Sequence, residues 1–144
     1  MKIIVAGGGA VGSRAASFLS KEGHEVVLIE KDQKKAEALS EELDALVLCG
    51  DASDRKLLKD GGVEKAGMMA VLTGDDKANL LICEVAKGFA VPLVVSRVND
   101  SSNESIFSDL GISSTINTAS LAISSLERIL DSEGRTSIGV GAGG

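Results

Sequence analysis

The stretch KIIVAGGGAVG, residues 2–12, decides the fold of this chain. A short apolar run leads directly into the pattern G-x-G-x-x-G of Gly7, Gly9 and Gly12, and an amphipathic stretch follows. Between a strand and a helix, this pattern predicts a turn that binds a pyrophosphate. Gly7 permits the tight turn, Gly9 lets the backbone approach the phosphates, and Gly12 lets the helix lie close to the strand. The unpaired amides at the start of the helix would then face the phosphates.

Glu30 ends the second apolar run, 18 residues after Gly12. An acid at this spacing accepts hydrogen bonds from the ribose hydroxyls of adenosine. Because its charge would repel a 2′-phosphate, the sequence favours NAD(H) over NADP(H), and Lys31 directly after it weakens that preference. Glu30 alone could equally be a solvated strand end, so the prediction of nucleotide binding depends on the acid, its spacing and the glycine turn together.

The rest of the chain alternates short apolar runs with amphipathic stretches. Continuous apolar runs are typical of parallel strands buried on both faces, and they predict strands at 2–6, 25–30, 45–49, 68–72, 92–96 and 114–116. Apolar residues at helical spacing predict helices at 10–22, 32–43, 53–60, 75–87, 103–110 and 118–130. This alternation predicts an α/β fold, a Rossmann-like doubly wound parallel sheet of about six strands with helices on both faces.

Two more loops follow predicted strands, at the edge of the sheet where ligands of open α/β folds bind. Gly50, Asp51 and Ala52 follow the third strand; Asp51 could bond an adenine amino group, or Asp51 or Ser53 could cap the next helix. Thr73 and Gly74 follow the fourth strand and could close over the far half of the ligand. Arg97, after the fifth strand, could face the phosphates or pair with an acid.

Composition narrows the classes of function. The 144 residues correspond to one domain, which we assign to residues 1–133, and a Gly-rich tail or linker to an absent carboxy-terminal lobe at 134–144. A net charge of −6 and only three aromatic residues, all Phe, disfavour a nucleic-acid partner. The first apolar run is far too short to cross a membrane, and no signal peptide precedes it. We therefore expect a cytoplasmic protein, with Cys49 and Cys83 as reduced thiols in the core.

The sequence offers nucleotide-binding residues but no visible acid–base chemistry. There is no Tyr, and the only His, His24, lies in a turn at the amino end of the sheet, opposite the predicted ligand edge. No Cys and His cluster has metal-ligand spacing. This pattern suits a sensor in which the ligand shifts a conformational balance. The alternatives are the cofactor domain of an NAD-dependent oxidoreductase without its substrate domain, and a dimerisation module with a vestigial site.

The last predicted helix has apolar residues on more than one side. Ala122, Leu126 and Ile129 share one face, while Leu121, Ile123 and Leu130 spread apolar surface to other sides of the helix. A helix of this kind often packs against two surfaces, here its own sheet and a second subunit. The alternative is a final helix that lies entirely against the edge of its own sheet.

The chain also resembles the TrkA amino-terminal, or RCK/KTN, domains of potassium transport proteins. The resemblance rests on six segments in order, IIVAGGGAVG, GHEVVLIEKD, LVLCGDASD, AVLTGDDKANLL, VVSRVND and LGISSTINTASLAISSLERIL, which span most of residues 1–130. It implies a non-catalytic Rossmann domain followed by a separate carboxy-terminal lobe. It also implies a cytoplasmic protein, peripheral to the inner face of the membrane, that forms a homodimer or larger ring through its last helix. Such proteins gate a membrane-embedded potassium channel or transporter subunit according to the bound nucleotide.

The resemblance also implies a set of ligand contacts. In this sequence, with Lys31 added beside Glu30, they fall on Gly7, Gly8, Gly9, Ala10, Val11, Gly12, Glu30, Lys31, Asp51, Ala52, Thr73, Gly74 and Arg97. Relatives that prefer ATP carry an Arg between the second and third glycines of the turn. Here Ala10 and Val11 occupy those positions, and Arg14 lies one turn into the helix. This difference favours NAD(H), with ATP or ADP as alternatives.

Overall fold

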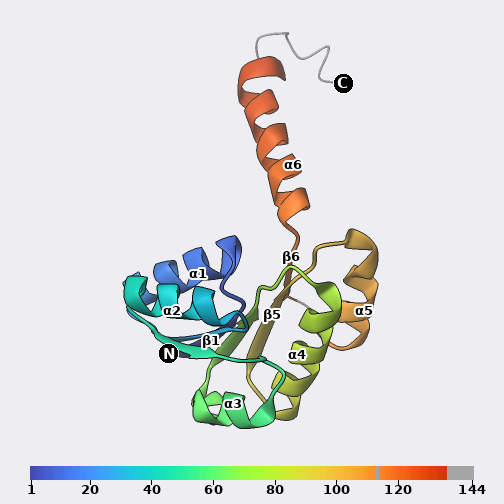
Figure 1. The fold of residues 1–144 in the computed structure, drawn as a ribbon. Helices are drawn as coiled ribbons and strands as arrows, with labels where there is room; N and C mark the ends of the chain where they lie inside the picture. Colours follow the sequence, from blue (N-terminus) through green and yellow to red (C-terminus); the bar gives the residue numbers. More distant parts are fainter. Residues whose placement is uncertain (113, 136–144) are drawn as a thin grey trace.

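The computed structural model describes residues 1–112 and 114–135. Its centre is a parallel six-stranded sheet in the order β3-β2-β1-β4-β5-β6 (Figure 1). The strands are β1 (Lys2–Ala6), β2 (Glu25–Glu30), β3 (Leu46–Cys49), β4 (Met68–Val71), β5 (Leu93–Arg97) and β6 (Ser114–Ile116). The chain builds outward from β1 to β3 and then returns to add β4 on the other side of β1. The strand order therefore reverses between β1 and β4, which confirms the doubly wound, Rossmann-like α/β fold.

Every predicted helix is present, within about two residues of its predicted ends. The helices are α1 (Ala10–Lys21), α2 (Gln33–Glu42), α3 (Arg55–Asp60), α4 (Asp76–Gly88), α5 (Glu104–Asp109) and α6 (Thr118–Ile129). Four begin at a capping side chain that accepts a backbone N–H of the first turn, from Asp32, Asp54, Asp75 and Asn117. These short acceptors satisfy amides that have no partner inside the helix, so the starts of the helices follow from the local sequence.

The core has two layers, one on each face of the sheet. Ile3 and Val5 of β1 point to the layer that α1 and α2 cover, together with Ala16 and Leu39. Ile4 of β1 points the opposite way, to the layer that includes buried side chains of α3, α4 and α5. Because successive residues of each central strand enter different layers, the whole strand must be apolar, which explains the continuous runs in the sequence.

The two cysteines differ in their environment. Cys83 on α4 is fully buried, as predicted, but Cys49 at the end of β3 is exposed. The prediction of a core thiol is wrong for Cys49 because β3 is an edge strand that pairs only with β2. The Cys49 Sγ atom lies 3.7 Å from the carbonyl oxygen of Lys31.

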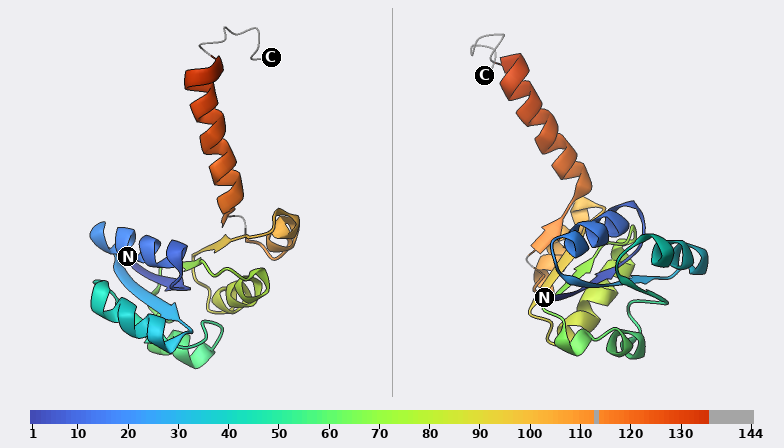
Figure 2. Two further views of the ribbon diagram at one scale, coloured as in Figure 1. Left: turned by 45° about the horizontal axis from the view of Figure 1, so that its top comes forward. Right: turned by 90° about the vertical axis from the view of Figure 1, so that its left-hand side faces the viewer.

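Helix α6 joins neither layer and extends away from the body of the domain (Figures 1 and 2). No residue of α6 is buried, and the side chains of Leu121, Leu126 and Ile129 are 56–57% exposed. The expectation that this helix packs against its own sheet is therefore wrong. A π-helical segment, Leu130–Arg135, continues α6, and residues 136–144 of the predicted Gly-rich tail lie outside the described residues. Within residues 1–112 and 114–135, no helix is both long and apolar enough for a membrane span.

Candidate nucleotide-binding site

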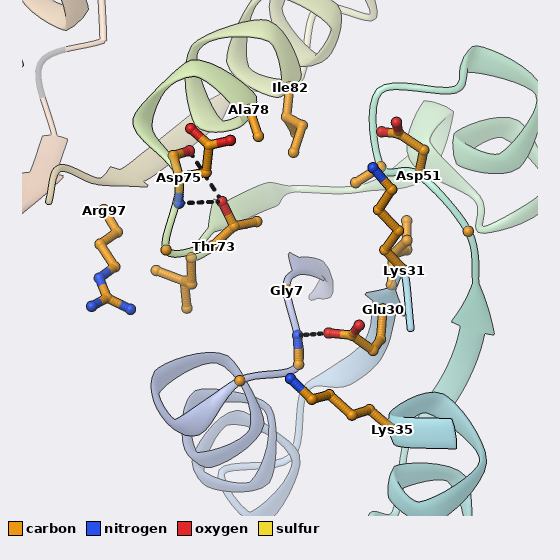
Figure 3. A pocket seen from close by; sticks show the side chains of 17 residues that line it. Gly7, Glu30, Lys31, Lys35, Asp51, Thr73, Asp75, Ala78, Ile82 and Arg97 are labelled. Atoms are coloured by element: carbon orange, nitrogen blue, oxygen red, sulfur yellow. Dashed lines mark hydrogen bonds between the residues drawn. The ribbon is translucent and has the colours of Figure 1, made fainter. Parts of the chain in front are cut away.

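A pocket of about 460 Å³ opens at the carboxyl ends of the strands, where the strand order reverses (Figure 3). Its walls come from the loops that follow β1, β2, β3, β4 and β5. Ten of the residues predicted from the sequence line it: Gly7, Gly8, Gly9, Glu30, Lys31, Asp51, Ala52, Thr73, Gly74 and Arg97. The fold thus gathers one surface from segments up to 90 residues apart in the chain. That these residues contact a nucleotide stays a prediction.

Three predicted residues, Ala10, Val11 and Gly12, do not line the pocket. They belong to the first turn of α1, which leads away from the opening. Gly12 is buried beneath the glycine turn, where an added Cβ atom would lie 1.7 Å from the carbonyl oxygen of Gly7. Its role is to let α1 pack on the turn, as the sequence pattern predicts.

The glycines of the turn have different physical roles. Gly7 has a φ of +104°, in the region that residues with a side chain rarely adopt. Gly8 is buried, and a Cβ there would lie 2.6 Å from a methyl group of Leu39. Gly9 and Gly74 have neither constraint, because a Cβ on either would meet no atom within 4 Å. Among the described residues, neither backbone conformation nor space for a Cβ requires glycine at these two positions, and both line the pocket.

Glu30 connects two turns at the mouth of the pocket. Its Oε1 accepts the Gly8 amide at 2.8 Å and its Oε2 accepts the Asp32 amide at 2.5 Å. The residue is only 9% exposed, so the carboxylate faces the glycine turn and not the solvent. A carboxylate has about four acceptor positions, so Glu30 can hold both amides and still accept from ribose hydroxyls.

Asn79, which sequence reasoning missed, holds the opposite wall of the pocket. It is fully buried on α4, and its Oδ1 accepts both the amide and the hydroxyl of Thr73, at 3.2 and 2.5 Å. Its Nδ2 donates to the carbonyl oxygens of Thr73 and Arg97, each at 3.0 Å. One side chain therefore joins the loop after β4 to the end of β5.

Asp76, at the start of α4, anchors the next loop. Its carboxylate accepts hydrogen bonds from the amide and side chain of Asn99 at 2.7 and 3.0 Å, the amide of Asp100 at 2.9 Å and the side chain of Asn103 at 2.8 Å. Partial burial by itself would raise the pKa of this carboxyl. The four hydrogen bonds outweigh that effect and hold the pKa at about 2, below the ordinary value of 3.8. The loop that follows Arg97 is thereby tied to α4.

Asp51 does not cap α3. Its Oδ1 accepts the amide and hydroxyl of Ser53, at 2.8 and 2.7 Å, while Asp54 caps the helix. The amide and hydroxyl of Ser53 lower the pKa of Asp51, with a smaller contribution from the charge of Lys31. Asp51 thus stays ionised and shapes the loop after β3 at the pocket wall.

Arg97 points into the pocket from the end of β5 (Figure 3). In the described part of the chain it forms no ion pair, and its buried Nε atom has no hydrogen-bond partner. The sequence leaves open whether Arg97 faces the phosphates or pairs with an acid. Among the described residues no such pair is found. The unpartnered guanidinium is available to an anionic ligand.

Sequence reasoning also missed several other pocket residues. Ala78 and Ile82, four apart on α4, form an apolar wall, while Asp75 and Lys35 add charge. The helical spacing of Ala78 and Ile82 was a usable signal. Within residues 1–112 and 114–135, no cluster of His, Cys, Asp and Glu could hold a metal ion. His24 lies at the other edge of the sheet, where its Nδ1 is 3.1 Å from the terminal amino group.

A parallel sheet with a glycine turn at its switch point and an acid at the end of β2 defines a Rossmann-type α/β domain. Within that class, the chain belongs to the TrkA-N domain family, whose model matches residues 3–118. The resemblance seen in the sequence is therefore confirmed.

The named relatives act in potassium uptake. The Trk system potassium uptake protein TrkA homolog of Methanothermobacter thermautotrophicus is 35% identical over 130 residues, which are 90% of this chain and 60% of that protein. The Trk system potassium uptake protein TrkA of Mycobacterium tuberculosis is 40% identical over 131 residues, 88% of this chain and 58% of the relative. The chain thus spans about three fifths of the length of these relatives.

Solved structures share the fold at lower identity. The NAD(P)-binding domain of an exopolyphosphatase-related protein from Archaeoglobus fulgidus superposes with a TM-score of 0.80 at 20% identity, over 90% of this chain and 97% of that one. The GsuK channel bound to NAD superposes with a TM-score of 0.72 at 16% identity, over 80% of this chain and 21% of the channel. GsuK bound to ADP superposes with the same TM-score and identity, over 81% of this chain and 31% of that one.

Proposed function

We propose that this chain is a non-catalytic, NAD(H)-binding regulatory domain that gates a potassium channel or transporter during potassium uptake. The observation that carries the proposal is the pocket at the strand switch point, where Gly9 and Gly74 leave room that the protein itself does not use. The named relatives point to potassium uptake. An oxidoreductase domain is not favoured, because the sole His lies at the opposite edge of the sheet and the sequence has no Tyr.

The pocket offers a place for each part of a dinucleotide. Glu30 would accept the adenosine ribose hydroxyls, and the diphosphate would lie against the backbone of Gly8 and Gly9. The nicotinamide half would extend toward Thr73 and Arg97. ATP or ADP would fill only the adenosine and phosphate positions.

Calorimetric titration of the chain with NADH, NAD⁺, ATP and ADP tests the proposal. We expect the two dinucleotides to bind, because only they reach both ends of the pocket, and the mononucleotides to bind more weakly. Equal or tighter binding of ATP or ADP would reassign the ligand to a mononucleotide. An absence of heat with all four ligands, in a sample whose circular dichroism is that of a folded protein, would contradict nucleotide regulation.

We also propose that α6 forms the contact with a second copy of the chain, in a homodimer or larger ring at the cytoplasmic face of the membrane transport subunit. At 100° per residue, Leu126 lies at the centre of the apolar face of α6, with Ala122, Ile123, Ile129 and Leu130 on either side. Four of these five side chains are large and more than half exposed. Burial of such side chains contributes about 1.5–3 kcal/mol each, which favours association.

Replacing Leu126 with Glu should therefore convert the assembly to a monomer. The charge would lie at the centre of the proposed contact, where desolvation opposes association. Sedimentation velocity on the wild type and the variant measures the outcome. Ser124→Glu adds the same charge on the side of the same helix that faces away from Leu126 and should leave the assembly unchanged. A wild type that sediments as a monomer, or a Leu126→Glu variant that still assembles, would contradict the role of α6.

A further inference from the structure

We propose that Lys35, assisted by Lys31, forms a phosphate-binding position at the ribose end of the pocket, so that the domain binds the 2′-phosphorylated dinucleotide NADP(H) as well as NAD(H). This inference rests on the proposed function, because it requires an adenine dinucleotide in the pocket. It differs from the preference that the sequence suggests, in which Glu30 would reject a 2′-phosphate. The reason lies in how the pocket distributes its charges.

The carboxylates that line the pocket are already engaged by the protein. Glu30 accepts two backbone amides, Asp51 accepts the amide and hydroxyl of Ser53, and Asp75 accepts the amide of Lys77 at 3.0 Å. These hydrogen bonds stabilise the ionised form of each acid and occupy part of its acceptor capacity. The three acids therefore stabilise the loops around the pocket by accepting these hydrogen bonds, and they also line the pocket.

The cations of the pocket are in the opposite situation. Lys31, Lys35 and Arg97 all line it, and within residues 1–112 and 114–135 none of them forms an ion pair. Lys31 is offset in part by Asp51, whose ionised form its charge favours. Among the described residues Lys35 forms no ion pair, and its side chain lines the pocket. Three cations and three carboxylates thus line the pocket, and among the described residues the cations form no ion pair.

The positions of Lys31 and Lys35 point to the ribose rather than to the far half of a dinucleotide. Lys31 follows Glu30 directly, and Lys35 lies in the first turn of α2, which the Glu30 carboxylate connects to the glycine turn. In Figure 3 the Lys35 side chain extends toward that turn, and Lys31 extends toward Asp51. A ribose bound at Glu30 would thus have an ammonium group on each side. A phosphate on its 2′-oxygen would meet two cations against one carboxylate.

Titration of wild type, Lys35→Gln and Lys34→Gln with NAD⁺ and NADP⁺ tests the inference. Lys34 is the matched control, because it is exposed on the same helix but does not line the pocket. We expect the wild type to bind NADP⁺ within about threefold of NAD⁺, or more tightly. Lys35→Gln should weaken NADP⁺ by about tenfold or more and NAD⁺ by less than about threefold, since one charge-assisted contact is lost. Lys34→Gln should change neither affinity.

The outcomes separate this inference from the proposed function. Binding of NAD⁺ with NADP⁺ weaker by more than about threefold would overturn the phosphate position and leave NAD(H) binding intact. An equal loss of both ligands in Lys35→Gln would also overturn it, because Lys35 would then contact the diphosphate that both ligands share. Failure of the wild type to bind either ligand would overturn the proposed function, and this inference with it.

Discussion

Valine in place of Gly9 should abolish nucleotide binding while the domain stays folded. Gly9 has φ −73° and ψ −164°, outside the left-handed region that favours glycine, and an added Cβ would meet no protein atom within 4 Å. Because Gly9 is the N-cap of α1, where glycine is preferred to valine, the free energy of unfolding should fall by about 1 kcal/mol, and the domain stays folded. The added side chain would instead occupy the space against the turn where the diphosphate is proposed to lie.

We expect the affinity for NADH to fall by about a hundredfold or more, which corresponds to about 2.7 kcal/mol. Calorimetry measures the affinity, and thermal unfolding followed by circular dichroism measures the fold. Gly88→Val is the matched control, because Gly88 lies at the end of α4, outside the pocket, where a Cβ would meet only the flexible end of Arg55. Wild-type affinity in Gly9→Val would show that no ligand approaches the turn closely.

Alanine in place of Gly12 should have the opposite effect and destabilise the fold itself. The added Cβ would lie 1.7 Å from the Gly7 carbonyl oxygen and 2.8 Å from its carbonyl carbon, so the backbone must move. Gly7 cannot yield easily, because its amide donates to the Ile29 carbonyl at 2.8 Å and its own φ is +104°. Separating α1 from β1 would also open the layer around Ala16. We expect a loss of about 3–5 kcal/mol, a large part of the stability of a domain this size.

Thermal unfolding should show this loss as a midpoint lower by about 10 °C or more. Gly74→Ala is the matched control, because a Cβ at Gly74 would meet nothing within 4 Å and its φ is not in the left-handed region. Its midpoint should equal that of the wild type. If Gly12→Ala unfolds at the wild-type temperature, then α1 does not depend on close packing against the turn.

The sheet and its helices could be predicted because their signals are local. A strand buried on both faces needs a continuous apolar run, and a helix start needs an acceptor such as Asp32 or Asn117 for its free amides. The glycine turn and Glu30 were found for the same reason, since one strand–turn–helix–strand unit contains both. The carboxyl ends of parallel strands meet at one edge, so the loops at Asp51 and Thr73 could also be placed there.

The rest of the site depends on contacts between distant segments. Asn79 reaches the Arg97 carbonyl 18 residues away, and Asp76 holds amides and side chains 23 to 27 residues away. No local pattern predicts the role of these residues, because an Asn or Asp within a helical stretch has the same sequence pattern whether or not it contacts a distant loop. Lys35 was missed for a related reason. Only the tertiary fold brings the first helical turn of α2 to the wall of the pocket.

The sequence by itself determined the strand–helix order, the glycine turn and the acid at the end of β2, because strand burial, helix capping and backbone conformation are properties of neighbouring residues. Only the tertiary structure decided which cations remain unpaired in the pocket and where α6 lies. The apolar pattern of α6 is the same whether it covers its own sheet or another chain. The physical reason is that hydrophobic burial is non-directional: it requires a partner surface but does not specify which one.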